Sequence, residues 1–184
     1  MTPFARLALP LFAFAALGAG CAGYHLGSPV PEELRAIHVP AFENNTEYPM
    51  VGAVAAQQFL DALIEEGIFE PTDFEHARLR TQVIVTGIAA DAVSYDRNNA
   101  ILPDEYRVTL RARLYAYDAR TGETLINGKP VSATDSALTR NDFQTGVMDA
   151  IPRLSRKLAQ NLLVELHGIA PTAALAPAEP PPPQ

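Results

Sequence analysis

Residues 105–118 read EYRVTLRARLYAYD and alternate between two kinds of side chain along their whole length. A period of two is typical of an extended strand that has one face buried and one face in water. We therefore expect an antiparallel strand that a second layer covers on one side only. The apolar side of the strand consists of Tyr106, Val108, Leu110, Ala112, Leu114 and Ala116. The polar side consists of Glu105, Arg107, Thr109, Arg111, Arg113 and Tyr115.

Three further strands are predicted around this one. Residues 82–95 (QVIVTGIAADAVSY) precede it and begin apolar on both faces, as expected of an inner strand. Residues 124–134 follow it after a turn. A short strand is predicted at residues 36–42 (AIHVPAF), where Pro40 has no N–H to give and so belongs at the strand's end or at a sheet edge.

A first amphipathic helix is predicted at residues 49–66. Its apolar side chains recur at spacings of three and four, and Gly67 follows as a plausible C-cap. Such a helix presents one apolar stripe, which must be buried against another element.

A second, longer apolar stripe runs from Phe143 to Leu166. Asn141 or Asp142 is the expected N-cap, because short polar side chains accept hydrogen bonds from the first helical N–H groups. Pro152 lies inside the stripe and removes a backbone hydrogen bond. Because the pattern stays in phase on both sides of the proline, we expect one kinked helix rather than two separate ones.

The predicted order is therefore strand, helix, three strands, helix. The fold class that this order favours is α/β (an α+β sandwich), with two amphipathic helices packed on one face of a four-stranded, mostly antiparallel or mixed sheet. This arrangement buries both helix stripes and leaves the arginine side of residues 105–118 open.

The first 20 residues have the layout of a bacterial secretion signal. Their apolar run is too short to span a bilayer, which takes about 20 residues. Cys21, the one cysteine of the chain, follows directly, and we expect cleavage before it and lipidation of it. Gly18 departs from the branched aliphatic residue usual at that place, and secretion without a lipid is the alternative. By resemblance to sorted lipoproteins, Ala22 favours the outer membrane.

These features predict four segments. Residues 1–20 are the signal peptide, 21–35 a lipidated N-terminal linker, 36–168 a single α/β domain and 169–184 a proline-rich tail. From residue 171 the tail reads PTAALAPAEPPPPQ, a composition typical of disordered or extended chain.

Charge and composition exclude several classes of function. The chain has 14 basic and 21 acidic residues, and the signal contains only Arg6 among them, so the remaining chain is still more acidic. An acidic protein is a poor general nucleic-acid binder. We find no phosphate loop, no nucleophile elbow and no metal-ligand spacing among the four histidines, and we expect no enzyme activity, no cofactor and no metal.

The candidate binding residues are basic. Arg107, Arg111 and Arg113 share one side of their strand, with Arg97 in the preceding hairpin and Lys129 on the next strand. Guanidinium groups bind phosphate and carboxylate in bidentate geometry, so an anionic ligand is one interpretation of this set. A solvated sheet face is the other.

Several segments resemble a known family. Residues 21–26 (CAGYHL) resemble the C-G-Y-H-L opening of the lipopolysaccharide-assembly lipoproteins (LptE-like), directly after the signal. Residues 37–46 (IHVPAFENNT) are similar to that family's I-x-V-P-x-F-x-N-x-T segment. Residues 106–108 (YRV) and 118–122 (DARTG) fit its later strands. The similarity covers residues 21–168.

The resemblance implies an outer-membrane lipoprotein, lipid-anchored on the periplasmic side, that sits as a plug in a lipopolysaccharide-translocating β-barrel. The pair would insert lipopolysaccharide into the outer leaflet, with the barrel as obligate partner and no catalysis, cofactor or metal. The basic residues would then contact lipopolysaccharide phosphates and acidic sugars. A structural lipoprotein of another envelope secretion or transport complex is the alternative.

Overall fold

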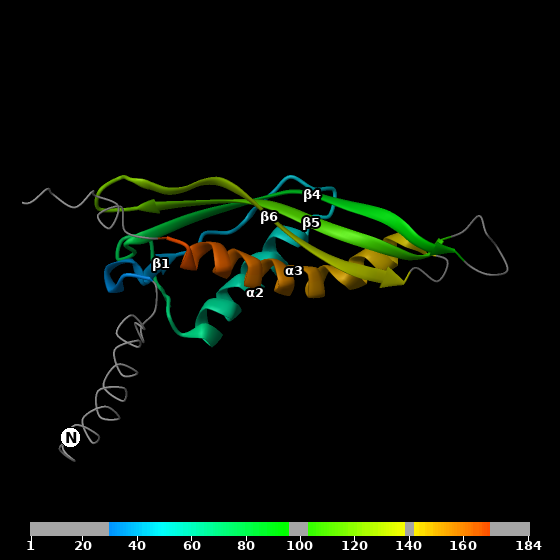
Figure 1. Ribbon diagram of the computed structural model, residues 1–184, viewed down its shortest axis with the longest axis horizontal. Coiled ribbons are helices and arrows are strands. Elements are labelled where there is room, and N and C mark those ends of the chain that lie inside the picture. Colours follow the sequence, from blue (N-terminus) through cyan, green and yellow to red (C-terminus); the bar gives the residue numbers. More distant parts are fainter. Residues whose placement is uncertain (1–29, 96–102, 139–141, 170–184) are drawn as a thin grey trace, which may run out of the picture.

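The computed structural model describes residues 30–95, 103–138 and 142–169, which form one mixed sheet with two helices against one of its faces (Figure 1). The helices are α2 (Val51–Glu66) and α3 (Phe143–His167). The three long strands are β4 (Leu79–Tyr95), β5 (Pro103–Asp118) and β6 (Thr124–Leu138). Short elements complete the described fold, namely η2 (Glu32–Leu34), β1 (Ala36–His38), β2 (Glu43–Asn44) and β3 (Glu70–Pro71).

The strands β4, β5 and β6 form two successive antiparallel pairs, with strand order β3-β1-β4-β5-β6 across the sheet. In β5 the predicted alternation is present in three dimensions, because Val108, Leu110, Ala112, Leu114 and Ala116 are all buried. The arginines between them are exposed. The alternation that placed β5 in the sequence thus separates a helix-covered face of the sheet from an open face.

The strand predicted at residues 36–42 ends at His38, and a second short strand, β2, follows beyond its predicted end, which changes the strand count. β1 pairs in parallel with the start of β4, and β2 pairs in parallel with β4 further along, at Ile84 and Val85. Pro40 lies between them and has no N–H for a ladder, so pairing stops and resumes beyond it. With the two-residue strand β3, the described residues form a sheet of six strands. The predicted fold class is confirmed, whereas the count of four is wrong.

Helix α2 buries the stripe that the sequence indicated, with Val51, Ala55, Phe59 and Leu63 inaccessible to solvent. It ends at Gly67, whose φ of 70° is the left-handed conformation that glycine adopts without strain. The C-cap prediction is therefore confirmed.

Helix α3 is continuous through Pro152, so the prediction of one helix is confirmed. Pro152 lies on the exposed side of the helix, where distortion of the backbone does not disturb the core. Asp142 is the N-cap and its carboxylate accepts the Gln144 backbone N–H at 3.0 Å. Phe143, which the sequence placed in the apolar stripe, is 42% exposed and packs edge-on against Tyr106, with ring centroids 4.8 Å apart.

A partly buried ion pair closes the base of the sheet. Arg78 donates from Nε and from its terminal nitrogen to the two carboxylate oxygens of Asp118, at 2.6 and 2.9 Å. Asp118 also accepts the backbone N–H groups of Arg120 and Thr121, which shapes the turn between β5 and β6. The hydrogen bonds from Arg78 hold the pKa of the Asp118 carboxyl well below its usual range.

Several predictions fall outside the described residues. They are the signal peptide, the lipidation at Cys21, the candidate ligand residue Arg97 and most of the proline-rich tail. Among the residues that the structure does describe, no helix is long and apolar enough to cross a membrane.

Candidate functional site on the open sheet face

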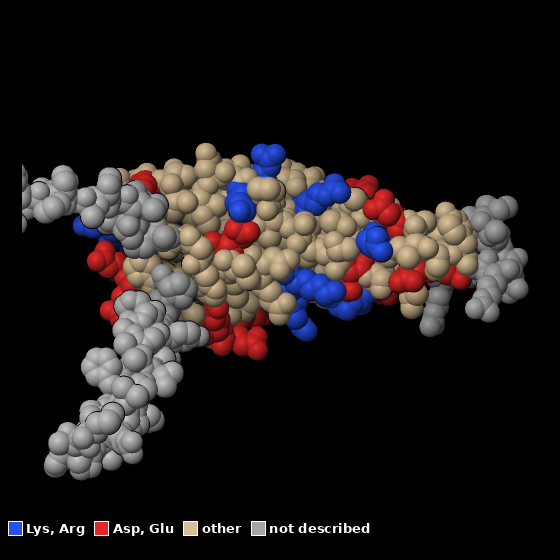
Figure 2. Space-filling model, in the orientation of Figure 1, with Lys and Arg blue, Asp and Glu red and all other residues tan. Residues whose placement is uncertain are grey.

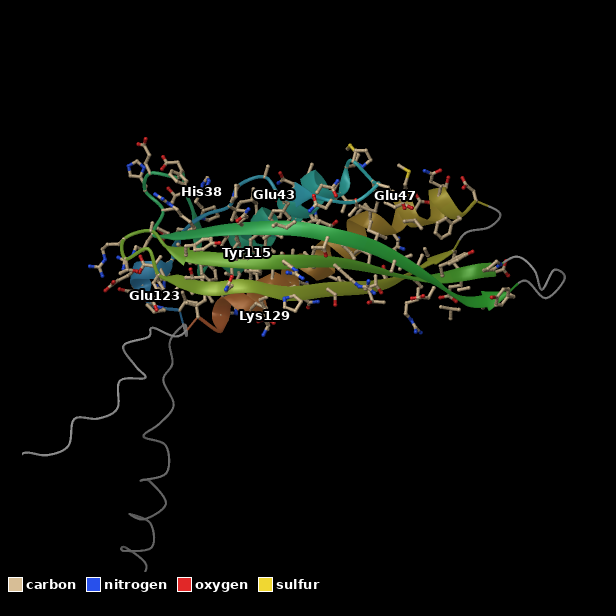
Figure 3. The ribbon with its side chains drawn as sticks, turned by 90° about the horizontal axis from the view of Figure 1, so that it is seen from above. His38, Glu43, Glu47, Tyr115, Glu123 and Lys129 are labelled. Carbon is tan, nitrogen blue, oxygen red and sulfur yellow. The ribbon has the colours of Figure 1, made fainter. Side chains whose placement is uncertain are left out.

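The open face presents Arg107, Arg111 and Arg113 from one strand, and all three are exposed. Strand geometry spaces residues by about 3.3 Å, so Arg107 lies roughly 13 Å from Arg111, and Arg113 about 7 Å further on. Figure 3 looks onto this face and shows β5 in the middle of the three long strands, with Tyr115 projecting from it. The predicted row is thus a linear array along the centre of the sheet.

Each arginine has defined cross-strand neighbours on the same face. Arg107 lies between Asp91 of β4 and Ser136 of β6. Arg111 lies opposite Ser132 on the β6 side, and between these two positions Thr109 and Thr134 place their hydroxyl oxygens 3.2 Å apart. The part of the row from Arg107 to Arg111 therefore runs beside a row of hydroxyl groups on β6, whereas Arg113 lies opposite Pro130.

This hydroxyl row is not among the candidate residues predicted from the sequence. The signal was present, because residues 131–137 (VSATDSA) alternate small apolar side chains with Ser132, Thr134 and Ser136 except at Asp135. A period of two of this kind marks the solvent side of a strand.

Within the described part of the chain, none of the three guanidinium groups of the row makes an ion pair or a hydrogen bond. Other basic side chains in the fold are engaged: Arg153 and Lys157 both contact Asp135, at 2.8 and 2.9 Å. Arg156 donates to Gln58 at 3.2 Å. The row therefore keeps its donors available to a ligand.

Lys129 does not belong to the row, which corrects the grouping made from the sequence. It lies opposite Leu114, whose side chain is on the covered face, and its Nζ is 3.4 Å from the Glu165 carboxylate of α3. Figure 3 shows Lys129 at the rim of the sheet beside α3. The arrangement joins β6 to the helix layer and leaves Lys129 on the wrong side of the sheet to act with the arginines.

The chemistry available on this face is anion binding. Guanidinium groups give bidentate hydrogen bonds to phosphate or carboxylate, and the hydroxyl row offers further donors. Because the charges are exposed and screened by salt, each contact contributes little and several must act together. Figure 2 views the sheet from the side and shows basic side chains spaced apart along the upper part of the molecule and gathered together lower down, over the helix layer. Among the described residues, no cluster of His, Cys, Asp or Glu has the geometry to hold a metal ion.

The model of one family, described as LptE, lipopolysaccharide-assembly, matches residues 34–166. This range spans more than half of the chain and contains all the described strands, helix α2, helix α3 except its last residue, and the last residue of η2. A comparison with curated protein sequences gives no match.

Solved structures share the fold at low sequence identity. Protein XCC0632 from Xanthomonas campestris has a TM-score of 0.52 and 7% identity, over 75% of this chain and 87% of its own. Protein CT253 from Chlamydia trachomatis has a TM-score of 0.51 and 7% identity, over 73% and 96%. A lipoprotein candidate from Caulobacter crescentus CB15 has a TM-score of 0.50 and 14% identity, over 74% and 93%. At these identities the similarity establishes the fold alone.

Proposed function

Because the chain belongs to the LptE lipopolysaccharide-assembly family, we propose that it is an outer-membrane lipoprotein that assembles with a lipopolysaccharide-translocating β-barrel. In this role it helps the barrel to insert lipopolysaccharide into the outer leaflet. The family match carries the proposal, since it covers the whole sheet and nearly all of both helices. The available arginine row supports it from the side of the ligand.

The proposed membrane anchor is Cys21. Lipidation there, after removal of residues 1–20, anchors the domain through the linker that ends at residue 35. Acyl chains contribute about 0.8 kcal/mol per buried methylene, so more than one chain gives a stable anchor. The anchor places the domain on the periplasmic side of the outer membrane.

The proposed ligand-binding site is the open face of the sheet. We assign contacts with lipopolysaccharide phosphates and acidic sugars to Arg107, Arg111 and Arg113, with Arg97 from the adjoining hairpin. Lys129 is left out of the ligand site because its ammonium group faces Glu165 on the other side of the sheet. The protein acts by binding and positioning, without a catalytic step, a cofactor or a metal.

The direct test is isolation of the full-length lipoprotein from its own membranes in detergent, with mass spectrometry of what accompanies it. The expected result is an outer-membrane barrel in comparable amount, together with loss of surface lipopolysaccharide when the lipoprotein is depleted. A different envelope complex as the companion, with lipopolysaccharide export intact on depletion, would contradict the proposal.

The anchor has its own control. Cys21→Ser is expected to abolish incorporation of labelled palmitate and to release the protein from membranes. If Cys21→Ser stays with the membrane fraction and the unaltered protein takes up no palmitate, the anchor proposal is wrong.

A further inference from the structure

The two long edges of the sheet are finished in different ways. At the β6 edge, α3 side chains cap three outward carbonyls: Asn161 donates to the Ser132 oxygen at 2.8 Å, Lys157 to Thr134 at 3.3 Å and Arg153 to Ser136 at 3.0 Å. Pro130 lies on the same edge in step with these residues and has no N–H to offer. Such devices prevent another strand from pairing with an edge.

The opposite edge belongs to β4, and only its first half is covered. β1 pairs with it at Leu79 and Arg80, and β2 at Ile84 and Val85. The last bond on this side runs from the Asn45 N–H to the Val85 oxygen at 2.9 Å. Among the described residues, no strand pairs with this side of β4 from residue 87 to residue 92.

The ladder shows which backbone groups are left open there. The backbone N–H and C=O groups of Ser132, Thr134 and Ser136 point away from β5. Because antiparallel pairs alternate, the backbone groups of the residues opposite them, Arg111, Thr109 and Arg107, point toward β4. The β4 residues opposite these three therefore point their backbone groups toward β5, and the backbone groups of Ile88, Ala90 and Ala92 point outward. The outward Val85 carbonyl, one bulge earlier, fits the same alternation.

The protective devices found on β6 are missing from this segment. Residues 87–92 read GIAADA, with no proline, no lysine and mostly small side chains. Bulges of the ladder lie at each end of the segment, between Val85 and Gly87 and between Ala92 and Ser94. They delimit a stretch of six residues whose open edge is long enough to pair with an incoming strand.

A small pocket lies where this open edge begins. Its volume is about 190 Å³, and it lies between the loop after β2 and the residues Gly87 and Ile88. The loop is held in shape by its own hydrogen bonds, from Asn44 Nδ2 to the Tyr48 oxygen at 2.9 Å and from Thr46 Oγ1 to Asn44 Oδ1 at 2.8 Å. The pocket is thus preformed, and it has the size to take one side chain.

The charges beside the open edge are acidic. Glu47 lines the pocket, and Asp91 lies within the open stretch on the arginine face. Both carboxylates are exposed, and neither forms an ion pair with another described residue. Figure 3 shows Glu47 on the side of β4 away from β5, next to the loop after β2. An incoming strand with basic side chains complements these two charges.

From this geometry we infer that an extended, basic segment of the barrel partner adds to the sheet as a further strand along residues 87–92 of β4. Backbone hydrogen bonds to Ile88, Ala90 and Ala92 provide the affinity, and the pocket near Tyr48 together with Asp91 provides the selectivity. On the covered face the segment places apolar side chains beside Ile88 and Ala90. The inference rests on the proposed function, because it names the surface that the barrel contacts.

Site-specific photocrosslinking in the full-length lipoprotein, in its own membranes, tests this surface. The photoreactive residue replaces Ala89 or Val93 beside the open edge, and Ser132 beside the covered edge serves as the control. The expected result is an adduct with the barrel from the first two positions only, mapped by peptide sequencing to an extended segment that contains lysine or arginine. A barrel that co-purifies yet crosslinks at neither edge position overturns the inference and leaves the proposed function standing.

Two other outcomes also decide the matter. An adduct between two copies of the lipoprotein at Ala89 or Val93 overturns the inference in favour of self-pairing. If no barrel co-purifies with the unaltered protein, the proposed function is wrong. The inference is then wrong as well, because the partner itself is absent and not because the edge is unoccupied.

Matched proline variants provide the second arm. Ala90→Pro removes an outward N–H from the open edge, and Leu138→Pro removes one from the outer edge of β6, in step with Ser136. We expect Ala90→Pro to lower the amount of co-purified barrel about tenfold, and Leu138→Pro to change it less than about twofold. If Ala90→Pro does not fold by circular dichroism, Asp91→Lys tests the same edge with an intact backbone and an expected loss of about fivefold. Full barrel recovery with a folded Ala90→Pro or with Asp91→Lys overturns the inference.

Discussion

On the helix-covered face of the sheet, basic side chains are paired, as Lys157 and Arg153 are with Asp135 and Lys129 is with Glu165. On the open face, Arg107, Arg111 and Arg113 have no such partner among the described residues. The paired residues fasten α3 to β6, so their charges contribute to the fold. The arginines of the open row make no contact of this kind, so their N–H donors remain available to an external anion. The same type of side chain thus has a structural role on one face and a proposed binding role on the other.

The covered face should react most strongly to loss of an apolar contact. Leu158 of α3 is fully buried beneath the sheet. Leu158→Ala is expected to lower the free energy of unfolding by about 3 to 4 kcal/mol, through lost burial and the cavity left behind. Urea denaturation of the unlipidated domain measures it. A loss below about 1 kcal/mol would show that this face is not the core of the fold.

The ion pair at the base of the sheet comes next. Asp118→Asn leaves Arg78 without its bidentate partner, and we expect a loss of about 2 to 3 kcal/mol. The effect also has a direction in pH. The pKa of Asp118 is lower in the folded state than its ordinary value of 3.8, so its contribution is complete above about pH 4. It is lost as the pH falls through the lower folded pKa.

This pH dependence has a simple measurement. Denaturation of the unaltered domain and of Asp118→Asn should differ most at neutral pH, and the difference should shrink as the solution is acidified below pH 4. A difference that is independent of pH would assign the loss to packing instead of to the carboxylate.

A smaller effect is expected where α3 meets the edge of β6. Burial raises the pKa of Asp135, but hydrogen bonds from Lys157 and Arg153 outweigh it and leave this pKa below its ordinary value. Asp135→Asn should cost about 1 kcal/mol, because both basic partners are about half exposed and solvent screens them. The loss should shrink in 1 M salt, whereas that of Leu158→Ala should not. If 1 M salt changes the loss of stability equally in both variants, the contact at Asp135 is not electrostatic in the way described.

The smallest effect on stability belongs to the open face. Arg111→Ala should change the free energy of unfolding by less than about 0.5 kcal/mol, since the side chain is exposed and without a described partner. Thermal denaturation checks this. A loss above about 1 kcal/mol would mean that the row supports the fold, and that the contrast between the faces is wrong.

The strict alternation of β5 made most of this architecture predictable. It placed the arginines on one face, and the spacing of apolar residues in α2 and α3 placed both helices on the other. The two-residue strands β2 and β3 were not predictable, because a segment that short carries no period and is defined only by its partners. The break at Pro40 was visible in the sequence as a loss of one N–H, but not as a second strand beyond it.

The side of the sheet on which Lys129 lies could be predicted from the sequence, but the grouping with the arginines did not use that information. It precedes Val131 and Ala133 at spacings of two and four, so the alternation of β6 already placed it on the covered side. The availability of the arginines is different in kind, because it depends on which acidic groups come near them in space. Asp135 turned toward α3, and only the folded chain shows that.

The most direct test of the account is a pair of measurements on one variant, Arg107→Glu with Arg111→Glu and Arg113→Glu, in the unlipidated domain. Arg120→Glu, an exposed arginine in the turn after β5, serves as the control outside the row. We predict that purified lipopolysaccharide binds the triple variant at least about tenfold more weakly. The free energy of unfolding should change by less than about 1 kcal/mol, and the control should alter neither. Unchanged lipopolysaccharide binding by a folded triple variant would contradict the account and leave the open face as solvated surface.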